Sequence, residues 1–157
     1  MTTALTDLSD IEIRRYGYDG AVADSIAEVC KLCFADPWSR EAVESTLRAE
    51  QNYVVAADGG KMGFAAASLA FDTADILDIA VCPAARRRGI GRAMLSHLLK
   101  LLRENGAKSV FLEVRVSNEG AIALYSSAGF KPCGIRKNYY TSPREDAALY
   151  VLEFTEV

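Results

Sequence analysis

The chain has 157 residues, of which half are hydrophobic and a quarter are charged. Its 18 basic and 21 acidic residues give a net charge of −3 at pH 7, a balance that disfavours a nucleic-acid-binding surface. Asp72, Asp75 and Asp78 interrupt the longest apolar stretch, so no run approaches the roughly 20 residues of a transmembrane helix. We therefore expect one soluble cytoplasmic domain over residues 1–157, with its core in 11–154 and no secretory signal.

Apolar periodicity and turn residues divide the chain into a succession of predicted strands and helices. In chain order these are a strand over 11–16, helices over 21–35 and 39–50, strands over 52–57, 61–71 and 74–81, a helix from 90 to Asn105-Gly106, a strand over 109–116, a helix over 118–127, and strands over 130–140 and 147–154. This order predicts an α/β (α+β) fold. Its mixed, mostly antiparallel sheet of about seven strands carries about four helices on its faces.

Four cysteines and one histidine limit the metal and redox chemistry that is possible. Cys30 and Cys33 have the spacing of half a zinc site, but no second Cys or His pair completes it. They also lie inside a helical pattern, whereas a redox motif would lie at a strand-to-helix turn. We expect reduced thiols that pack as small apolar side chains, no metal, and no role for His97.

The most informative segment joins a predicted strand to a predicted helix. The strand ends at Ile79-Ala80-Val81, and the helix opens at Gly89-Ile90-Gly91. The first amide groups of a helix lack intrahelical acceptors, the helix dipole favours an anion there, and glycine permits a close approach. Positive charge is added by Arg86, Arg87, Arg88 and Arg92. The segment therefore predicts a phosphate cradle built from backbone N–H groups.

Two common phosphate motifs do not fit this segment. A Walker loop has Lys-Ser/Thr after its last glycine, where this chain has Arg92-Ala93. A dinucleotide fingerprint has a third glycine where this chain has Met94, and it follows the first strand of its fold. The alternative without a ligand is a glycine-rich helix start beside solvated arginines. The Arg-x-x-Gly-x-Gly spacing after a buried strand argues against that alternative.

The spacing Arg86-x-x-Gly89-x-Gly91 resembles the pyrophosphate-binding motif of the GCN5-related N-acetyltransferases (GNAT), which bind acetyl-CoA. The predicted order of elements over 11–154 is also similar to that fold. Four further segments resemble the RimI-like branch, whose members acetylate the N-terminal alanine of a small-subunit ribosomal protein: 34–39, 112–118, 121–130, and 136–140 with 144–147. Asp78 and Cys82 depart from the family pattern, which often has an Asn and an acidic residue at these positions.

The resemblance implies which residues hold acetyl-CoA. They are Ile79, Ala80, Val81, Arg86, Arg87, Arg88, Gly89, Ile90, Gly91, Arg92, Ala93, Asn118 and Tyr125. A backbone N–H near Ala80 or Val81 would polarise the thioester carbonyl if the strand splays from its neighbour there. Asn118 would hydrogen-bond the pantetheine arm; it is also placed to cap the following helix, and the two roles are compatible.

Glu113 and Tyr125 are the catalytic candidates. Glu113 interrupts an apolar strand, and burial would raise its pKa toward a value useful for a base; a solvated charge or an arginine partner is the alternative. The resemblance assigns Tyr125 as the acid that protonates the departing thiolate, and a core aromatic is the alternative. No cysteine has an evident activating base, so we expect direct transfer without a covalent enzyme intermediate.

Aromatic and acidic residues on predicted loops are candidates for contact with the acceptor: Trp38, Tyr139, Tyr140, Glu145 and Asp146. They would suit a free peptide N-terminus followed by basic residues, and ordinary surface packing is the alternative. We predict a metal-independent monomer that acetylates the N-terminal amine, with alanine first, of a ribosomal protein, without nucleic-acid or membrane partners. The open alternatives are acetylation of a lysine, polyamine or small molecule, a silent acetyl-CoA-binding adaptor, and an RNA-binding module.

Overall fold

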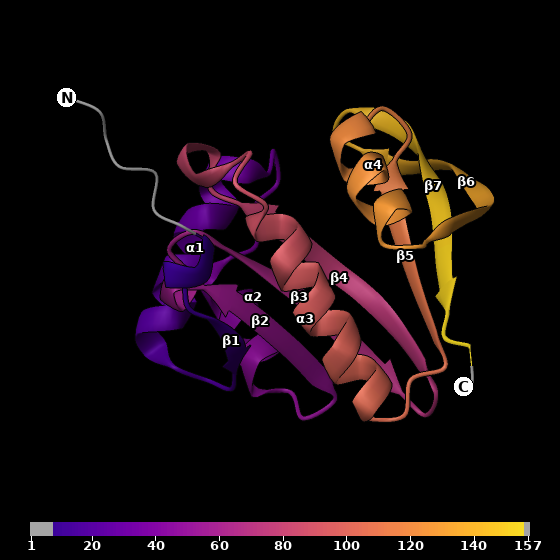
Figure 1. Cartoon of the computed structure of the whole chain (residues 1–157). Helices are drawn as coiled ribbons and strands as arrows, with labels where there is room; N and C mark the ends of the chain where they lie inside the picture. Colours follow the sequence, from indigo (N-terminus) through magenta and orange to yellow (C-terminus); the bar gives the residue numbers. More distant parts are fainter. Residues whose placement is uncertain (1–7, 156–157) are drawn as a thin grey trace.

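A seven-stranded sheet with the order β1-β2-β3-β4-β5-β7-β6 forms the centre of the computed structural model, which describes residues 8–155 (Figure 1). The strands are β1 (Ile13–Tyr16), β2 (Asn52–Ala57), β3 (Gly63–Ala70), β4 (Thr73–Val81), β5 (Ser109–Arg115), β6 (Lys131–Thr141) and β7 (Arg144–Glu153). The helices are α1 (Gly20–Cys33), α2 (Arg40–Arg48), α3 (Ile90–Glu104) and α4 (Glu119–Ser127), with 3-10 turns η1 (Leu8–Asp10), η2 (Asp58–Gly60) and η3 (Pro83–Ala85). Only β4 and β5 pair in parallel, which confirms the predicted mixed, mostly antiparallel sheet.

The largest difference from the predicted boundaries lies at the hairpin of β6 and β7. Residues 141–146 were expected to form a polar connection, but only Ser142 and Pro143 separate the two strands. Thr141 pairs with Arg144, and Tyr140 pairs with Glu145. Because β6 is an edge strand, polar residues can pair in this hairpin without the alternating apolar pattern that marks a half-buried strand.

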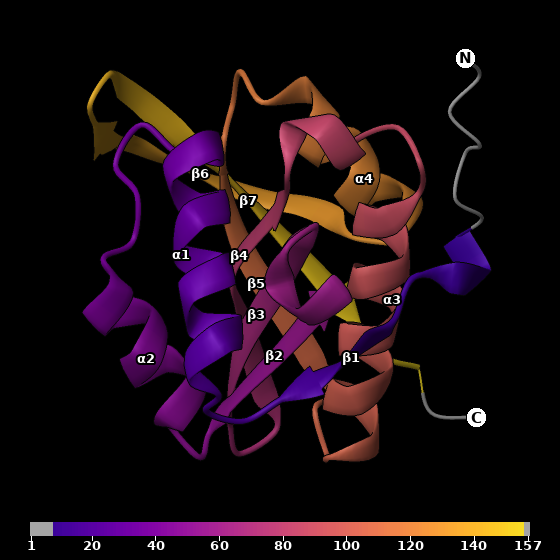
Figure 2. The ribbon, with the colours of Figure 1, turned by 90° about the vertical axis from the view of Figure 1, so that its left-hand side faces the viewer.

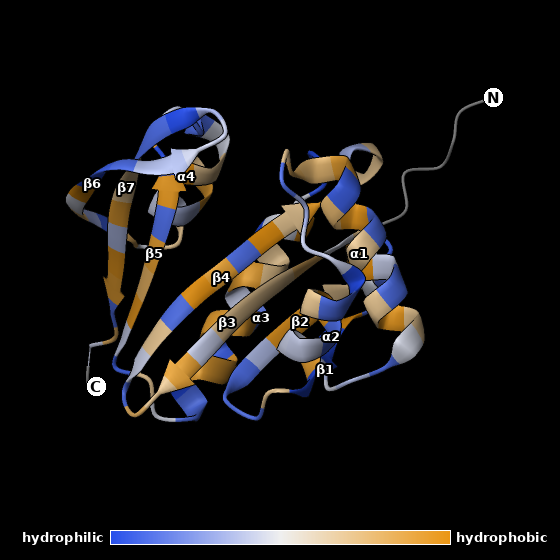
Figure 3. Cartoon of the chain, turned by 180° about the vertical axis from the view of Figure 1, so that it is seen from behind, coloured by the Kyte–Doolittle hydropathy of each residue, from blue (hydrophilic) through white to orange (hydrophobic). Residues whose placement is uncertain are grey.

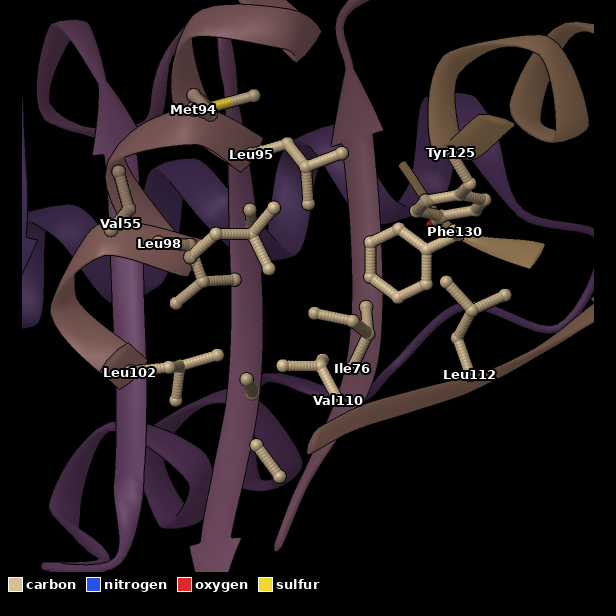
Figure 4. Packing of buried hydrophobic residues seen from close by; sticks show 14 of the residues in the cluster. Val55, Ile76, Met94, Leu95, Leu98, Leu102, Val110, Leu112, Tyr125 and Phe130 are labelled. Atoms are coloured by element: carbon tan, nitrogen blue, oxygen red, sulfur yellow. The ribbon is translucent and has the colours of Figure 1, made fainter. Parts of the chain in front are cut away.

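Helices cover both faces of the sheet over β2, β3 and β4 (Figure 2). On one face, the apolar stripe of α3 is fully buried at Met94, Leu95, Leu98 and Leu102 (Figure 4). On the other face, α1 and α2 enclose a second cluster around Phe64. No helix within residues 8–155 is both long and apolar enough to cross a membrane.

The other end of the sheet has a helix on one face only. Val110, Leu112 and Val114 of β5 belong to the core cluster that also contains Tyr125 of α4. Successive strand residues point to opposite faces, so Phe111, Glu113 and Arg115 lie on the face away from α4. Seen from that side, the ribbon of β5 has no helix in front of it (Figure 3). Phe111 is accordingly 38% exposed.

β4 and β5 separate after a short pairing, and this separation positions the site. Thr73–Asp75 pairs with Ser109–Phe111, while the rest of β4 as far as Val81 pairs with β3 alone. The register of β4 against β3 shifts between Ile76 and Asp78, which leaves Leu77 as a bulge residue. A bulge bends and twists a strand, and β4 diverges from β5 beyond this point (Figure 1).

Candidate functional site

A cavity of about 1010 Å³ lies where β4 and β5 diverge. Its walls come from the end of β4, the start of α3, the start of α4, the β6–β7 hairpin, Arg115 of β5, and residues 33–36 at the end of α1. α1 packs with the cluster on one face of the sheet, while α3 packs with the cluster on the other. The cavity therefore crosses the plane of the sheet.

The start of α3 forms one wall and presents unpaired backbone amides. The first hydrogen bond of the helix runs from Ala93 N to Gly89 O at 3.0 Å. The amides of Ile90, Gly91 and Arg92 have no acceptor among residues 8–155. Gly89 occupies the N-cap position with φ 80, in the left-handed region that glycine adopts without strain, and no side chain caps the helix. These amides and the helix dipole suit an anion at this wall.

Arg86 and Arg87 place positive charge next to these amides. Arg86 donates from Nε to Val81 O at 3.0 Å, and its Nη2 lies 3.5 Å from Cys33 Sγ. These contacts join the end of β4 to the end of α1 across the cavity. Arg87 also lines the cavity and has φ 64, which turns the chain from η3 into Gly89. The basic loop is therefore a folded part of the wall.

Most, but not all, of the predicted acetyl-CoA-binding residues line this cavity. Those that do are Ile79, Ala80, Val81, Arg86, Arg87, Gly89, Ile90, Gly91 and Asn118. Those outside the lining are Arg88, Arg92, Ala93 and Tyr125. Asn118 Oδ1 accepts from Ala121 N at 3.1 Å, so this side chain caps α4 and lines the cavity at the same time.

Tyr125 lies behind the cavity wall in the core. Its side chain is buried, and its ring meets Phe130 edge-on at 5.7 Å between centroids (Figure 4). The hydroxyl has no hydrogen-bond partner among residues 8–155, but it keeps some exposure to solvent. Burial and the nearby charge of Asp78 raise the pKa of Tyr125 above its usual value. The phenol therefore keeps its proton at neutral pH.

The structure contradicts the expected burial of Glu113. The side chain is 31% exposed, and its Oε1 lies 4.0 Å from Arg136 Nη1, a long ion pair between β5 and β6. Glu113 points to the face of β5 opposite Leu112, because the strand alternates. It does not line the cavity. Glu113 therefore has the arginine partner that the sequence analysis gave as the alternative to burial.

The five predicted acceptor contacts fall into two groups. Tyr139 and Tyr140 line the cavity, and their rings meet at 5.0 Å. The other three lie outside its lining. Trp38 packs on Phe64 with 5.6 Å between ring centroids. Asp146 accepts from Asn138 N at 2.8 Å.

Glu145, the third acceptor candidate outside the lining, holds neighbouring residues at the rim of the cavity in place. It accepts from Ser117 N at 2.8 Å and from Arg115 Nη1 at 3.2 Å. These hydrogen bonds from Ser117 and Arg115 lower the pKa of Glu145. Arg115 lies in turn over the ring of Tyr140 at 4.2 Å. Glu145 thus positions Arg115 against a cavity-lining tyrosine.

Sequence reasoning gave no role to Asp78, which lines the cavity near the start of the divergence. Its Oδ1 accepts from Ile79 N at 3.0 Å, and no ion pair joins it to any residue in 8–155. Burial raises the pKa of Asp78 to about 7, although the hydrogen bond from Ile79 opposes the shift. Its departure from the family pattern was the signal that could have marked it.

The cysteines form no metal centre in the described part of the chain. All four are free thiols, and no group of three potential ligands comes together within residues 8–155. Cys30 is buried, and burial raises its pKa to about 12. Cys133 is exposed, contrary to the expectation of buried thiols.

Comparisons with known proteins agree with this architecture. Residues 23–130 match the family model described as Acetyltransferase (GNAT) family. The chain is 41% identical over 121 residues to an Escherichia coli protein named [Ribosomal protein bS18]-alanine N-acetyltransferase, covering 75% of this chain and 82% of that protein. It is 40% identical over 118 residues to N-alpha-acetyltransferase RimI of Mycobacterium tuberculosis, covering 71% and 73% of the two chains.

A solved structure shows the same likeness in three dimensions. The crystal structure of the E. coli ribosomal-protein-S18-alanine N-acetyltransferase superposes with a TM-score of 0.80 at 34% identity. The match covers 93% of this chain and 96% of that one. With the family model matching well over half of the sequence, the chain belongs to the GNAT family of acetyltransferases.

Proposed function

We propose that this protein transfers acetyl from acetyl-CoA directly to the N-terminal amine, on alanine, of a small-subunit ribosomal protein. The names of its relatives in E. coli and M. tuberculosis support the N-terminal acceptor, and the E. coli name supports alanine and the ribosome. The protein would act as a monomer in the cytoplasm, where ribosomal proteins are made. No metal takes part in the proposed reaction.

One observation carries the proposal: the unpaired amides of α3 open onto a cavity bordered by the unpaired edge of β4. The chemistry of this lining fits acetyl-CoA. The amides of Ile90, Gly91 and Arg92 would hold the diphosphate with Arg87. The open edge of β4 and the side-chain amide nitrogen of Asn118, which has no partner among residues 8–155, would hydrogen-bond the pantetheine arm. When bound, acetyl-CoA supplies an acetyl group activated as a thioester.

The alternation of β5 supports a proposed arrangement in which the two substrates approach from opposite faces of the sheet. α3 and Tyr125 lie with the same core cluster, so the donor thioester would approach from that face. Glu113 lies on the opposite, uncovered face, from which a peptide has access. The divergence of β4 from β5 joins the two approaches. Glu113 would then act on the amine, and Tyr125 would donate its proton to the leaving thiolate.

The chemistry of the acceptor favours an α-amine over a lysine side chain. An α-amino group has a pKa of about 7.7–8.0, compared with about 10.4 for lysine. At pH 7 about a tenth of the α-amine is therefore uncharged and nucleophilic, a far larger fraction than of lysine. A carboxylate that acts directly or through water is a sufficient base for such an acceptor.

The test is mass spectrometry of two synthetic peptides after incubation with labelled acetyl-CoA. One peptide has a free N-terminal alanine, and its control has the same sequence with a blocked N-terminus and an internal lysine. We expect label on the alanine peptide alone, with matching thiol release. Label on the blocked peptide would point to a lysine acetyltransferase, and acetyl-CoA binding without thiol release would point to a silent adaptor. Salt-sensitive RNA binding that acetyl-CoA leaves unchanged would point to an RNA-binding module.

Two substitutions test the proposed roles within that assay. Glu113→Gln and Tyr125→Phe should each lower turnover, by about 10²- to 10⁴-fold if each transfers a proton. Acetyl-CoA affinity, measured by calorimetry, should stay close to the wild-type value. Wild-type turnover by both variants would remove these two assignments while leaving the reaction itself intact.

A further inference from the structure

Asp78 and Asp36 both line the cavity, and Asp78 is the one that lies on β4, close to the point where β4 leaves β5. The Leu77 bulge separates it from the part of β4 that pairs with β5, and Asp78 pairs with Ala66 of β3. Ala66 belongs to the cluster beneath α1 and α2, so Asp78 lies on that face of the sheet. Glu113 shares this face but lies outside the lining.

The carboxylate of Asp78 has capacity left for a ligand. Oδ1 accepts the amide of Ile79, and Oδ2 has no partner among residues 8–155. No fully buried side-chain oxygen in the described residues lacks a hydrogen bond, so Oδ2 must be at least partly exposed. Asp78 lines the cavity, which is the open space that the structure has next to this side chain. An ammonium group is the natural ligand for a carboxylate oxygen that no cation of residues 8–155 neutralises.

Several charged groups lie near Asp78, but none of those within residues 8–155 forms an ion pair with it. The titratable and charged groups that face it or share its cavity are Cys30 and Cys33 of α1, Asp36, Glu113 and Arg115 of β5, Tyr125 of α4, Tyr139 and Tyr140 of β6, and Arg86 and Arg87. The negative charge of Asp78 raises the pKa of Cys30, Tyr125 and Tyr140, which places it near all three. The adjacent residues of β3, Ala65 to Ala67, add no titratable group.

We propose that Asp78 binds the acceptor as its ammonium ion and takes the first proton from it, before Glu113 acts. This inference rests on the proposed N-terminal acetylation. A carboxyl group whose pKa lies near 7 is matched to an α-ammonium with a pKa of about 7.7–8.0, since the proton can pass between them at little cost. The enzyme could then use the acceptor form that predominates at neutral pH.

The proton balance gives the two carboxylates separate tasks. Asp78 accepts one proton from the ammonium and later releases it to solvent. As the nitrogen forms its bond to the acetyl carbon, the bond between that carbon and sulfur breaks. Glu113 receives the second proton of the nitrogen and later releases it to solvent. Tyr125 gives its proton to the thiolate and regains one from solvent. The net products are the acetylated amine, the free thiol and one proton.

The test is the ratio of wild-type to Asp78→Asn kcat/KM on the alanine peptide as a function of pH. With an amine pKa near 8, about a tenth of the acceptor is neutral at pH 7, and the Asn variant would depend on that fraction. The ratio should therefore be about tenfold at pH 7 and should approach one at pH 9.5. Asp75→Asn on the same strand is the matched control, because Asp75 is exposed and lies outside the cavity lining. Its ratio should stay near one throughout.

A second readout does not depend on turnover. In protein labelled with ¹³C at the aspartate carboxyl carbons, one resonance should titrate near pH 7, and it should be missing from Asp78→Asn. Acetyl-CoA binding by the same variant, measured by calorimetry, verifies that it is folded.

The outcomes separate this inference from the function on which it rests. Wild-type transfer combined with a ratio that is independent of pH, or an Asp78 resonance that titrates near 4, overturns the role of Asp78 and leaves the proposed function standing. Failure of the wild type to acetylate the alanine peptide at any pH overturns the proposed function and this inference together.

Discussion

The two ends of the sheet are built differently. β2, β3 and β4 have helices on both faces and are made largely of small buried residues, such as Ala65, Ala66 and Ala67 of β3. β5, β7 and β6 have only α4 on one face, and every residue of β6 except Tyr140 is exposed. The first end supplies a rigid cradle at α3, while the second supplies an accessible face. The cavity lies at the boundary between the two, where the proposed donor and acceptor would meet.

The largest contrast between the two ends should appear on truncation of an aliphatic side chain. Leu98→Ala removes a fully buried side chain of α3 and should lower the free energy of unfolding by about 2–5 kcal/mol. Ile135→Ala in β6 removes a side chain that is 57% exposed and should cost about 0.5 kcal/mol or less. Urea unfolding of both variants measures the difference. Equal losses would show that β6 is as tightly packed as α3.

Asp78, at the boundary between the two ends, should make the free energy of unfolding depend on pH. The folded chain keeps the Asp78 proton up to about pH 7, while the unfolded chain releases it near pH 3.9, so the Asp78 contribution to stability falls as pH rises between these values. Asp78→Asn should therefore raise the free energy of unfolding by up to about 4 kcal/mol at pH 8. The gain should vanish near pH 4. Thermal melts at the two pH values check this, and a gain that is the same at both would contradict it.

Adding a methyl group to a glycine should also destabilise the helix-covered end of the sheet more than the β6 end. A Cβ at Gly63 of β3 would collide with the carbonyl oxygen of Ala80, so Gly63→Ala must push β3 and β4 apart, at a cost of about 1–3 kcal/mol. A Cβ at Gly134 of β6 would meet only Leu149 Cδ1, at 3.4 Å. Gly134→Ala should therefore change the free energy of unfolding by less than about 1 kcal/mol. Denaturation midpoints compare the two, and a costly Gly134→Ala would place β6 among the close-packed strands.

The smallest expected effects concern two helix N-caps, one that only stabilises its helix and one that also lines the cavity. Ser39 caps α2 by accepting from Ala42 N at 3.0 Å, and Asn118 caps α4 by accepting from Ala121 N at 3.1 Å. Either residue changed to Ala should cost about 1 kcal/mol of stability. Only Asn118→Ala should also weaken acetyl-CoA binding in calorimetry, since only Asn118 lines the cavity. Equal affinities for both variants would limit Asn118 to capping.

The sequence was sufficient for the order of elements and for the amides at the start of α3 that have no acceptor among residues 8–155, because both depend on local chemistry. Helical spacing identified the buried stripe of α3, and the pair Gly89 and Gly91 marked its unpaired amides. Both strands of the β6–β7 hairpin were predicted, but their extension into residues 141–146 was not, because polar residues at an edge strand leave no periodic signal. Tertiary contacts decided the rest. The interruption of an apolar strand by Glu113 did not reveal which face of the sheet its side chain takes. Trp38 packs on Phe64 and Glu145 accepts from Arg115, and neither contact could be predicted from the sequence.

Asp78 shows the limit of motif reasoning most clearly. A single aspartate in a strand gives no indication of its surroundings, since its environment depends on the bulge at Leu77 and on helices distant in sequence. Its burial became visible only when β4 was placed beside α1 and α4. The departure of this position from the family pattern was visible in the sequence, but its chemical meaning required the fold.

A passage that crosses the sheet separates the routes of the two products. Under the proposed function, the thiol would depart on the face of α3 and the modified peptide on the opposite face, so neither would have to wait for the other. A single molecule that joins coenzyme and peptide would span both sides at once. Because its second half binds intramolecularly, it should hold the enzyme far more tightly than either half alone.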